Sequence, residues 1–222
     1  MKTLFQLVLV ISCLPLLPAQ VWRSVAKTGP STRSGSAMTY DAMRNHVLLF
    51  GGKSHRKCMD DTWTWDGKTW TQIKTVTSPS ARYSHTMAFD SKRGRVVLFG
   101  GRSNNVFLSD TWEWDGKKWL KCNPPTTPPP RINHAMTFDS TRQRIVLFGG
   151  QQRSGIDSRT WEWDGKKWMS KKPSVRPIGR YHHALAFDKS RNRTVFFGGF
   201  YNSKLPQETW EWDGASWKQF PA

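Results

Sequence analysis

Three histidines recur at a constant interval, and their side chains could bind a metal ion. His85, His134 and His183 lie 49 residues apart, and Ser36 holds the corresponding place one interval earlier. Neutral imidazole is the commonest protein ligand for zinc and copper, so three imidazoles around one axis could hold such an ion. A repeated histidine that bonds the backbone of its own repeat explains the set without a metal, whereas zinc ligands must converge to about 2.1 Å. We favour this structural interpretation and predict no metal site and no cofactor.

Arginines recur with the same interval and could bind an anion. Arg33, Arg82, Arg131 and Arg180 each precede the position of Ser36 or of a histidine by three residues. Guanidinium groups bind carboxylates and phosphates through paired donors, so four of them around one opening would make an anion site. Alternatively, each arginine bonds carbonyl groups or pairs with an acidic residue between repeats. We keep Arg82, Arg131 and Arg180 as candidate ligand-binding residues.

Groups that could carry out acid–base or nucleophilic catalysis are scarce. The acidic residues follow the repeat, as Glu113, Glu162 and Glu211 do, and none forms an isolated pair that departs from it. A catalytic site should depart from the repeat. The sequence contains no nucleophile elbow, no phosphate-binding loop and no zinc-protease motif. We therefore predict no catalytic residues and a protein that is not an enzyme.

Four short segments vary while their surroundings repeat. They cover residues 53–58, 102–107, 151–156 and 200–205 and combine basic, amide and aromatic groups. Binding residues are commonly held on variable loops by a rigid scaffold, so we predict that these loops share one face and bind a protein or an anionic glycan; the alternative is four connectors without a ligand. The candidate residues are Lys53, Arg56, Lys57, Arg102, Arg153, Tyr201 and Lys204.

The elements that position these residues follow from the 49-residue interval, which organises most of the chain. A double glycine occurs at Gly51–Gly52, Gly100–Gly101, Gly149–Gly150 and Gly198–Gly199. Tryptophan pairs follow it at Trp63/Trp65, Trp112/Trp114, Trp161/Trp163 and Trp210/Trp212. Repeats of roughly 20–50 residues indicate an architecture in which each unit buries its apolar face against its neighbours.

Each repeat has the pattern of four short antiparallel strands. In the third repeat, residues 134–138 and 160–163 alternate, residues 144–148 form a β-branched and aromatic run, and a fourth strand begins near Lys167. Asp164-Gly165 predicts a tight type I′ hairpin, in which both central residues have positive φ. The two tryptophans of each pair are two residues apart, so both rings lie on one face, which we expect the adjacent repeat to cover. Four strands per unit is the layout of a β-propeller blade, and the predicted fold class is all-β.

The repeat resembles the kelch repeat, most closely the Trp-Glu-Trp-Asp-Gly variety of exported bacterial kelch proteins. The resemblance covers almost the whole chain after the N-terminal segment. It implies a kelch-type β-propeller and a scaffold that binds protein or glycan, although some kelch propellers are enzymes. An extracytoplasmic carbohydrate-active enzyme, or a fragment of one, is therefore the alternative function. The resemblance implies that galactose-oxidase-like members need a copper site with tyrosine ligands, and the tyrosines of this chain form no such set. In the third repeat the motif comprises Arg131, His134, Phe138-Asp139, Arg142, Val146 to Gly150, Thr160 to Gly165 and Trp168.

The array looks incomplete as a propeller. We place blades at about residues 33–81, 82–130, 131–179 and 180–222, whereas kelch propellers usually have more than four. Residues 21–32 match the end of a repeat and predict an orphan outer strand. The chain could be a fragment, could close as a four-bladed ring, or could join a second chain; we favour a fragment or an open array, with an unsettled oligomeric state.

The N-terminus and the charge bear on location and partners. Residues 1–19 have the pattern of a signal peptide, with an apolar run shorter than the about 20 residues of a membrane span. We predict a secreted or periplasmic protein, or alternatively a lipoprotein anchored through Cys13. The net charge of +18 favours anionic partners without implying specific nucleic-acid binding. Cys58 and Cys122 occupy different repeat positions, and we favour free thiols over a disulfide.

Overall fold

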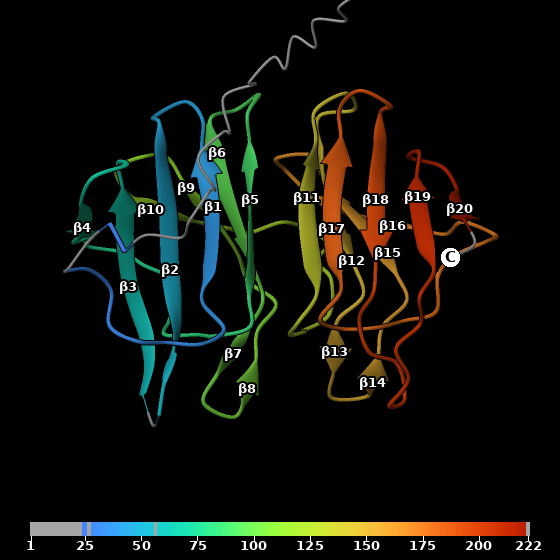
Figure 1. Cartoon of the computed structure of the whole chain (residues 1–222), viewed down its shortest axis with the longest axis horizontal. Helices are drawn as coiled ribbons and strands as arrows, with labels where there is room; N and C mark the ends of the chain where they lie inside the picture. Colours follow the sequence, from blue (N-terminus) through green and yellow to red (C-terminus); the bar gives the residue numbers. More distant parts are fainter. Residues whose placement is uncertain (1–23, 26–27, 56, 221–222) are drawn as a thin grey trace, which may run out of the picture.

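A computed structural model describes residues 24–25, 28–55 and 57–220, and every regular element in this part is a strand (Figure 1). The predicted signal peptide and Cys13 lie outside the described residues. Blade 1 contains β1 (Ala37–Asp41), β2 (His46–Ser54), β3 (Lys57–Trp65) and β4 (Trp70–Ile73). Blade 2 contains β5 (Thr86–Asp90), β6 (Arg95–Phe99), β9 (Thr111–Trp114) and β10 (Trp119–Cys122). Blade 3 contains β11 (Ala135–Asp139), β12 (Arg144–Phe148), β15 (Thr160–Trp163) and β16 (Trp168–Lys171). Blade 4 contains β17 (Ala184–Asp188), β18 (Arg193–Phe197), β19 (Thr209–Trp212) and β20 (Trp217–Phe220).

Each 49-residue unit forms one four-stranded antiparallel sheet, which confirms the predicted all-β fold class. The strands pair in chain order from the innermost to the outermost; in blade 3, for example, Thr137 lies opposite Val146, which lies opposite Glu162. The variable segments of blades 2 and 3 form two small hairpins, β7 (Arg102–Ser103) with β8 (Val106–Phe107), and β13 (Gln151–Gln152) with β14 (Gly155–Ile156). Within the predicted orphan strand, residues 21–32, the described residues form no strand.

The four blades form an open arc. The innermost strands β1, β5, β11 and β17 lie side by side in this order, whereas β1 and β17 do not pack together in the same way within the described chain. In Figure 1 the outermost strands β4 and β20 lie at opposite ends of the longest axis, and the inner strands face the viewer between them. These described residues therefore form a propeller-like arc without a closed ring.

Three apolar cores of matching composition lie between the blades. The first combines Leu48 and Phe50 of blade 1 with Trp112, Trp114 and Trp119 of blade 2. The residues at the same repeat positions build the cores between blades 2 and 3 and between blades 3 and 4. Both tryptophans of a pair thus face the preceding blade, as predicted from their spacing. Buried aromatic side chains of this size dominate the apolar area that a small β-sheet can remove from water.

Hydrogen bonds between blades also repeat. Indole groups of one blade donate to hydroxyl or carboxylate groups on the face of the preceding blade. Bonds of 2.9 Å join Trp119 to Thr62, Trp168 to Thr111 and Trp217 to Thr160. Bonds of 3.1 and 3.0 Å join Trp163 to Glu113 and Trp212 to Glu162. Each blade therefore has a donor face rich in tryptophan and an acceptor face that carries a phenylalanine, a threonine and, after blade 1, a glutamate.

The double glycine allows adjacent blades to approach closely. Gly100 has a φ of +65°, and a Cβ atom there would lie 2.9 Å from the carbonyl oxygen of Arg131. The amide of Gly101 donates a hydrogen bond of 2.9 Å to the same carbonyl. A side chain at Gly100 would both strain the backbone and push the blades apart.

The Asp-Gly hairpins lie at the predicted positions, but the predicted turn type is wrong. Positive φ occurs at Gly165 and not at Asp164. The connection between β15 and β16 has four residues, and the carboxylate of Asp164 accepts hydrogen bonds of 2.8 Å from the amides of Lys166 and Lys167. Because the side chain of the aspartate closes the loop, its backbone does not need the left-handed conformation that a two-residue type I′ turn requires.

Blade 1 lacks one of the repeated acceptors, which suggests a stabilising substitution. Thr64 stands where the other blades have glutamate, and Trp114 Nε1 is buried without an acceptor among the described residues. We expect Thr64→Glu to raise the free energy of unfolding by about 1 kcal/mol, because the carboxylate would accept from Trp114 as Glu113 does from Trp163. Urea unfolding would measure the change, with Thr77→Glu in the exposed connection after β4 as the charge-matched control. Equal midpoints for the two variants would contradict the expectation.

Candidate binding face

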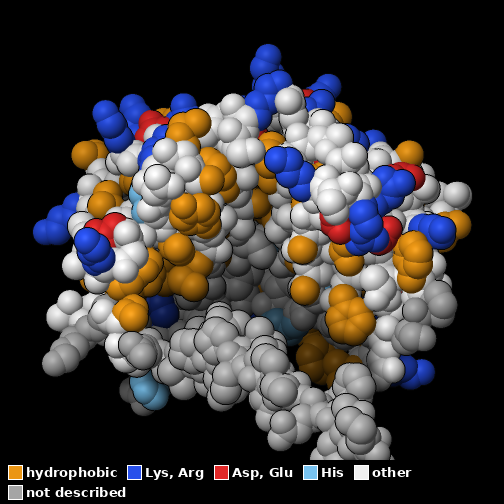
Figure 2. Space-filling model, turned by 45° about the horizontal axis from the view of Figure 1, so that its top comes forward, with side chains coloured by type: hydrophobic (Ala, Val, Ile, Leu, Met, Phe, Trp, Pro, Cys, Tyr) orange, Lys and Arg blue, Asp and Glu red, His pale blue; other side chains and the backbone are white. Residues whose placement is uncertain are grey.

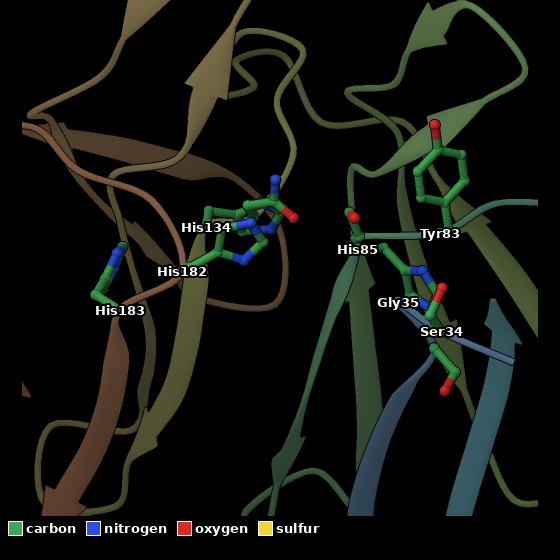
Figure 3. A pocket seen from close by; sticks show the side chains of 10 residues that line it. Ser34, Gly35, Tyr83, His85, His134, His182 and His183 are labelled. Atoms are coloured by element: carbon green, nitrogen blue, oxygen red, sulfur yellow. The ribbon is translucent and has the colours of Figure 1, made fainter. Parts of the chain in front are cut away.

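A cavity of about 560 Å³ lies where the four inner strands begin (Figure 3). All four blades contribute to its wall. The lining residues are Ser34, Gly35, Ser36, Tyr83, Ser84, His85, Asn133, His134, His182 and His183. Figure 3 shows the labelled histidines, Tyr83 and the Ser34-Gly35 segment arranged around the hollow from both halves of the arc. The repeated histidines named in the sequence analysis therefore line one cavity together with residues that were not candidates there, such as Tyr83 and His182.

A backbone ladder holds this wall in place. Gly35, Ser84, Asn133 and His182 occupy one repeat position, and all have positive φ between 55° and 64°. The amide of Ser84 donates to the carbonyl of Gly35 at 2.7 Å, Asn133 donates to Ser84 at 3.0 Å, and His182 donates to Asn133 at 3.0 Å. Glycine and asparagine tolerate this conformation, so their occurrence at one repeat position could have predicted the positive φ of these lining residues from the sequence. Sequence analysis did not use it.

The repeated histidines pack between blades. The rings of His85, His134 and His183 meet those of Phe50, Phe99 and Phe148 of the preceding blades edge to face, each with 5.6 Å between centroids. Burial, with the nearby Arg82 charge, lowers the pKa of His85 to about 3. Burial, with the Arg180 charge, lowers that of His183 to about 3. Burial also lowers the pKa of His134 far below its ordinary value, and the charge of Arg131 adds to this shift.

These three imidazoles are thus neutral at pH 7 and contribute packing. Within the part of the chain that the structure describes, no group of three His, Cys, Asp or Glu side chains is placed to hold a metal ion.

The repeated arginines do not form a ring around the cavity. Arg82, Arg131 and Arg180 are fully buried inside their own blades. They pair with carboxylates at 2.7–2.9 Å, namely Asp110, Asp157 and Glu208. Each also donates from Nη1 to the carbonyl of the first glycine of the double glycine, as Arg82 does to Gly100 at 3.0 Å. The proposed anion-binding role does not fit this placement, because the donors are already occupied by the carboxylates and carbonyls that hold the loop ends.

The variable loops flank the cavity. Isolated backbone pairs connect the cavity wall to the start of each loop: Ser34 with Lys53, Tyr83 with Arg102, Ile132 with Gln151 and Tyr181 with Phe200. In Figure 1 the adjoining ends of β2 and β3 and the hairpins β7–β8 and β13–β14 all project from the lower edge of the arc. Arg153 Nη2 also donates to the carbonyl of Asn105 at 2.7 Å, linking two neighbouring loops. The loops and the cavity mouth together form one surface, which we call the loop face.

The basic candidates differ in their surroundings. Lys53 lies over the ring of Tyr83, with 5.3 Å from Nζ to the centroid, at the cavity wall. Arg102 folds back onto its own hairpin, donating to Asn104 and Asn105. Lys57, Arg153 and Lys204 are exposed, and Tyr201 is half-buried. Arg56 lies outside the described residues.

A smaller cavity of about 350 Å³ separates the loops of blades 2 and 3. Val106, Phe107, Pro129 and Pro130 form its apolar part, and Gln152, Arg153 and Ser154 form its polar part. Sequence analysis missed it because the two prolines precede the next repeat and meet the loop only in the folded chain. The two described cysteines, Cys58 and Cys122, are free thiols in separate blades. Burial raises the pKa of Cys122 to about 12, so this thiol is a poor nucleophile at neutral pH.

Comparison with protein families agrees with the architecture. The family model of the KLHDC2/KLHL20/DRC7 Kelch-repeats domain matches residues 16–127. The chain belongs to the kelch-repeat family. Its four-stranded blades with double glycines and spaced tryptophans form a kelch β-propeller-like fold, which suggests a protein-binding scaffold. No curated protein matches this kelch-repeat chain. In the described residues there is no helix with the length and apolar character needed to cross a membrane.

Proposed function

We propose that this kelch-repeat chain is a non-enzymatic scaffold that binds an acidic segment of another protein on its loop face. The observation that carries the proposal is the charge of the four variable loops. Residues 53–58, 102–107, 151–156 and 200–205 contain six Lys or Arg residues and no Asp or Glu. The carboxylates that follow the other three loops, Asp110, Asp157 and Glu208, are paired with the buried arginines, whereas Asp60 beside the first loop is exposed. The loop face therefore presents an excess of positive charge to a partner.

The neighbouring cavities favour a polypeptide as the partner. The smaller cavity combines the apolar side chains of Phe107 and Pro130 with the guanidinium group of Arg153. A segment with a carboxylate next to an apolar side chain would satisfy both parts. An anionic glycan is the second candidate, because Tyr83 and Phe200 border the cavity and the loops with aromatic rings. The loops begin directly at paired strands, so the rigid sheets hold the loop residues in place for binding either partner.

Binding of defined anionic probes tests the proposal. We expect a fluorescent peptide of alternating Glu and Leu residues to bind, and Lys57→Glu with Arg153→Glu to weaken binding about tenfold or more, equivalent to about 1.4 kcal/mol. The control is Lys68→Glu with Lys117→Glu, which makes the same charge change at exposed turns on the opposite edge of the blades. Binding should also weaken as salt rises, because exposed charges are screened over about 8 Å at physiological ionic strength.

The outcomes separate the candidates. Heparin binding that depends on the loop lysines, without peptide binding, would replace the protein partner by a glycan. Equal weakening by the loop and turn variants would contradict a dedicated loop face, because only net charge would then matter. Turnover of a carbohydrate substrate by the purified chain would contradict the non-enzymatic assignment.

We also propose that the protein works outside the cytoplasm. The support is the sequence pattern of residues 1–19, with its basic start, apolar run and small residue at Ala19. Mass spectrometry of the protein recovered from an exporting host should give a chain that begins near Gln20. A mature chain that begins at a lipid-modified Cys13 would instead indicate the anchored alternative, and an uncleaved chain would contradict export.

A further inference from the structure

Among the described residues, each outermost sheet face of the arc lacks the neighbouring blade that every internal face has, although Gly29 lies close to Trp70 at the outer edge of blade 1. Blade 1 presents a donor face, which we call the leading face and which comprises Met38, Tyr40, Val47, Leu49, Trp63, Trp65 and Trp70. Blade 4 presents an acceptor face, which we call the trailing face and which comprises Ala184, Ala186, Val195, Phe197, Thr209 and Glu211. The same repeat positions meet each other in all three internal cores.

Exposure distinguishes these faces from their internal counterparts. Phe50, Phe99 and Phe148 are completely buried under the next blade, whereas Phe197 at the same position is 53 % exposed. Met38 is 58 % exposed, whereas Met87 at the same position of blade 2 is 7 % exposed. Figure 2 shows apolar side chains bordering the central hollow on both of its sides. Contiguous apolar surface of this kind marks an interface more often than a solvated surface.

The polar groups of the two faces are complementary as well. On the trailing face, Thr209 and Glu211 stand where Thr160 and Glu162 accept the indole protons of Trp217 and Trp212. On the leading face, Trp65 and Trp70 stand at the positions of these donors. Arg191 pairs with Glu211 as Arg142 pairs with Glu162, so the acceptor is already oriented. If a leading face packed on a trailing face, Trp65 could donate to Glu211 and Trp70 to Thr209, as their counterparts do between blades 3 and 4.

Two repeated glycine positions also distinguish the outermost faces from the internal interfaces. At Gly51, Gly100 and Gly149, a Cβ atom would meet the carbonyl oxygen of the next blade's arginine at 2.5–2.9 Å, whereas Gly198 has no described neighbour within 4 Å. At Gly116, Gly165 and Gly214, it would meet an arginine of the preceding blade, whereas Gly67 again has no such neighbour. Gly198 belongs to blade 4 and Gly67 to blade 1. At both ends of the arc, the space that atoms of an adjacent blade occupy at the internal interfaces is therefore free of described residues.

We propose that a second copy of this chain occupies both faces, the trailing face of each chain packing on the leading face of the other. The first and last blades lie at opposite ends of the arc in Figure 1, so a second arc can meet both at once. Head-to-tail contacts that close in this way form rings instead of filaments. Two chains give eight blades, which is within the usual range of propellers. The inference goes beyond the proposed function because it uses neither the loops nor the cavity.

Sedimentation of the full chain, purified as its host processes it, tests the assembly. We expect a dimer of twice the chain mass. Phe197→Lys on the trailing face should raise the dimer dissociation constant about tenfold or more, because it places a charge against Trp70 and its neighbours. Met38→Lys on the leading face should do the same. Val76→Lys is the control, since Val76 is exposed on a connection outside both faces. Unfolding curves of the variants should match those of the parent at concentrations where the parent is dissociated, because both substituted side chains are exposed; at higher concentrations the dimeric parent should be the more stable.

A mixture of the two variants gives the decisive result. The Phe197→Lys chain keeps an intact leading face, and the Met38→Lys chain keeps an intact trailing face. Mixing them should restore a one-to-one complex through a single interface, whereas neither variant associates strongly alone. A parent chain that stays monomeric at all concentrations, a dimer unaffected by Phe197→Lys, or a mixture that remains monomeric would each overturn the proposal. Species that grow beyond the dimer with concentration would overturn the closed ring.

Discussion

Replacing Arg82 by alanine is expected to lower the free energy of unfolding by about 3–5 kcal/mol, the usual cost of breaking a buried ion pair from one side. Arg82 is fully buried and forms a bidentate pair with Asp110, with N–O distances of 2.7 and 2.8 Å. It also donates to the carbonyls of Ser80 and Gly100. Although burial alone would raise the pKa of Asp110, the hydrogen bond and charge of Arg82 hold that pKa below its ordinary value. The substitution would leave a partly buried carboxylate and two carbonyl groups without their donor.

Denaturant unfolding of the purified chain measures this cost. Arg82→Lys should recover little of it, because an ammonium group cannot reproduce the planar pair of donors. Arg153→Ala removes an exposed guanidinium group and should change stability by no more than about 0.5 kcal/mol. If Arg82→Ala and Arg153→Ala were equally stable, the buried arginines would not be structural, and a ligand-binding role would return to consideration.

The blades were predictable because their determinants are local. A double glycine, an Asp-Gly pair and tryptophans two residues apart each restrict a few neighbouring residues, and the 49-residue interval repeats these restrictions in register. Turn type was less predictable. The sequence pair Asp164-Gly165 is compatible with a two-residue and a four-residue loop, and the choice depends on whether the aspartate side chain closes the loop itself.

The arginines show why repetition alone does not reveal a site. Arg82 and its counterparts recur because each blade needs a donor for its own loop ends, and the partner carboxylates lie 26 or 28 residues further along the chain. Such a separation is closed only by folding, so the sequence left the anion-binding and structural interpretations open. The cavity wall was missed for a similar reason. Its members, such as Tyr83 and His182, come from different repeats and meet only where the inner strands begin.

The residues that pack the blades together and the variable residues proposed to bind a partner lie in separate parts of each repeat. The buried histidines and tryptophans face neighbouring blades, where one change affects a whole interface, and the buried arginines hold the loop ends of their own blades. The loops begin after the double glycine and contribute no residue to the three apolar cores. Substitutions on the loop face should therefore alter binding with little effect on folding, which makes the binding and stability experiments independent of each other.

The buried histidines should make the fold sensitive to mild acid. In the unfolded chain a histidine titrates near pH 6.5, whereas the folded pKa of His85 and of His183 is about 3 and that of His134 is also strongly lowered. Between these values the unfolded chain binds protons that the folded chain does not bind. The stabilising effect is therefore complete above about pH 6.5 and is lost as the pH falls toward 3. At pH 5 His85 and His183 should each cost about 2 kcal/mol, and His134 adds a loss in the same direction.

Urea unfolding at pH 7, 6 and 5 measures this loss separately from that of the carboxylates, whose ordinary pKa values lie near 4. His85→Ser, which copies the residue that blade 1 has at Ser36, should reduce the slope of stability against pH, whatever its effect on stability at pH 7. His182→Gln is the matched control for removing an imidazole, because His182 is exposed at the same cavity. Stability that is constant from pH 7 to pH 5 would show that the three imidazoles accept protons in the folded chain. The cavity wall would then hold charged imidazoles, which their packing on Phe50, Phe99 and Phe148 does not predict.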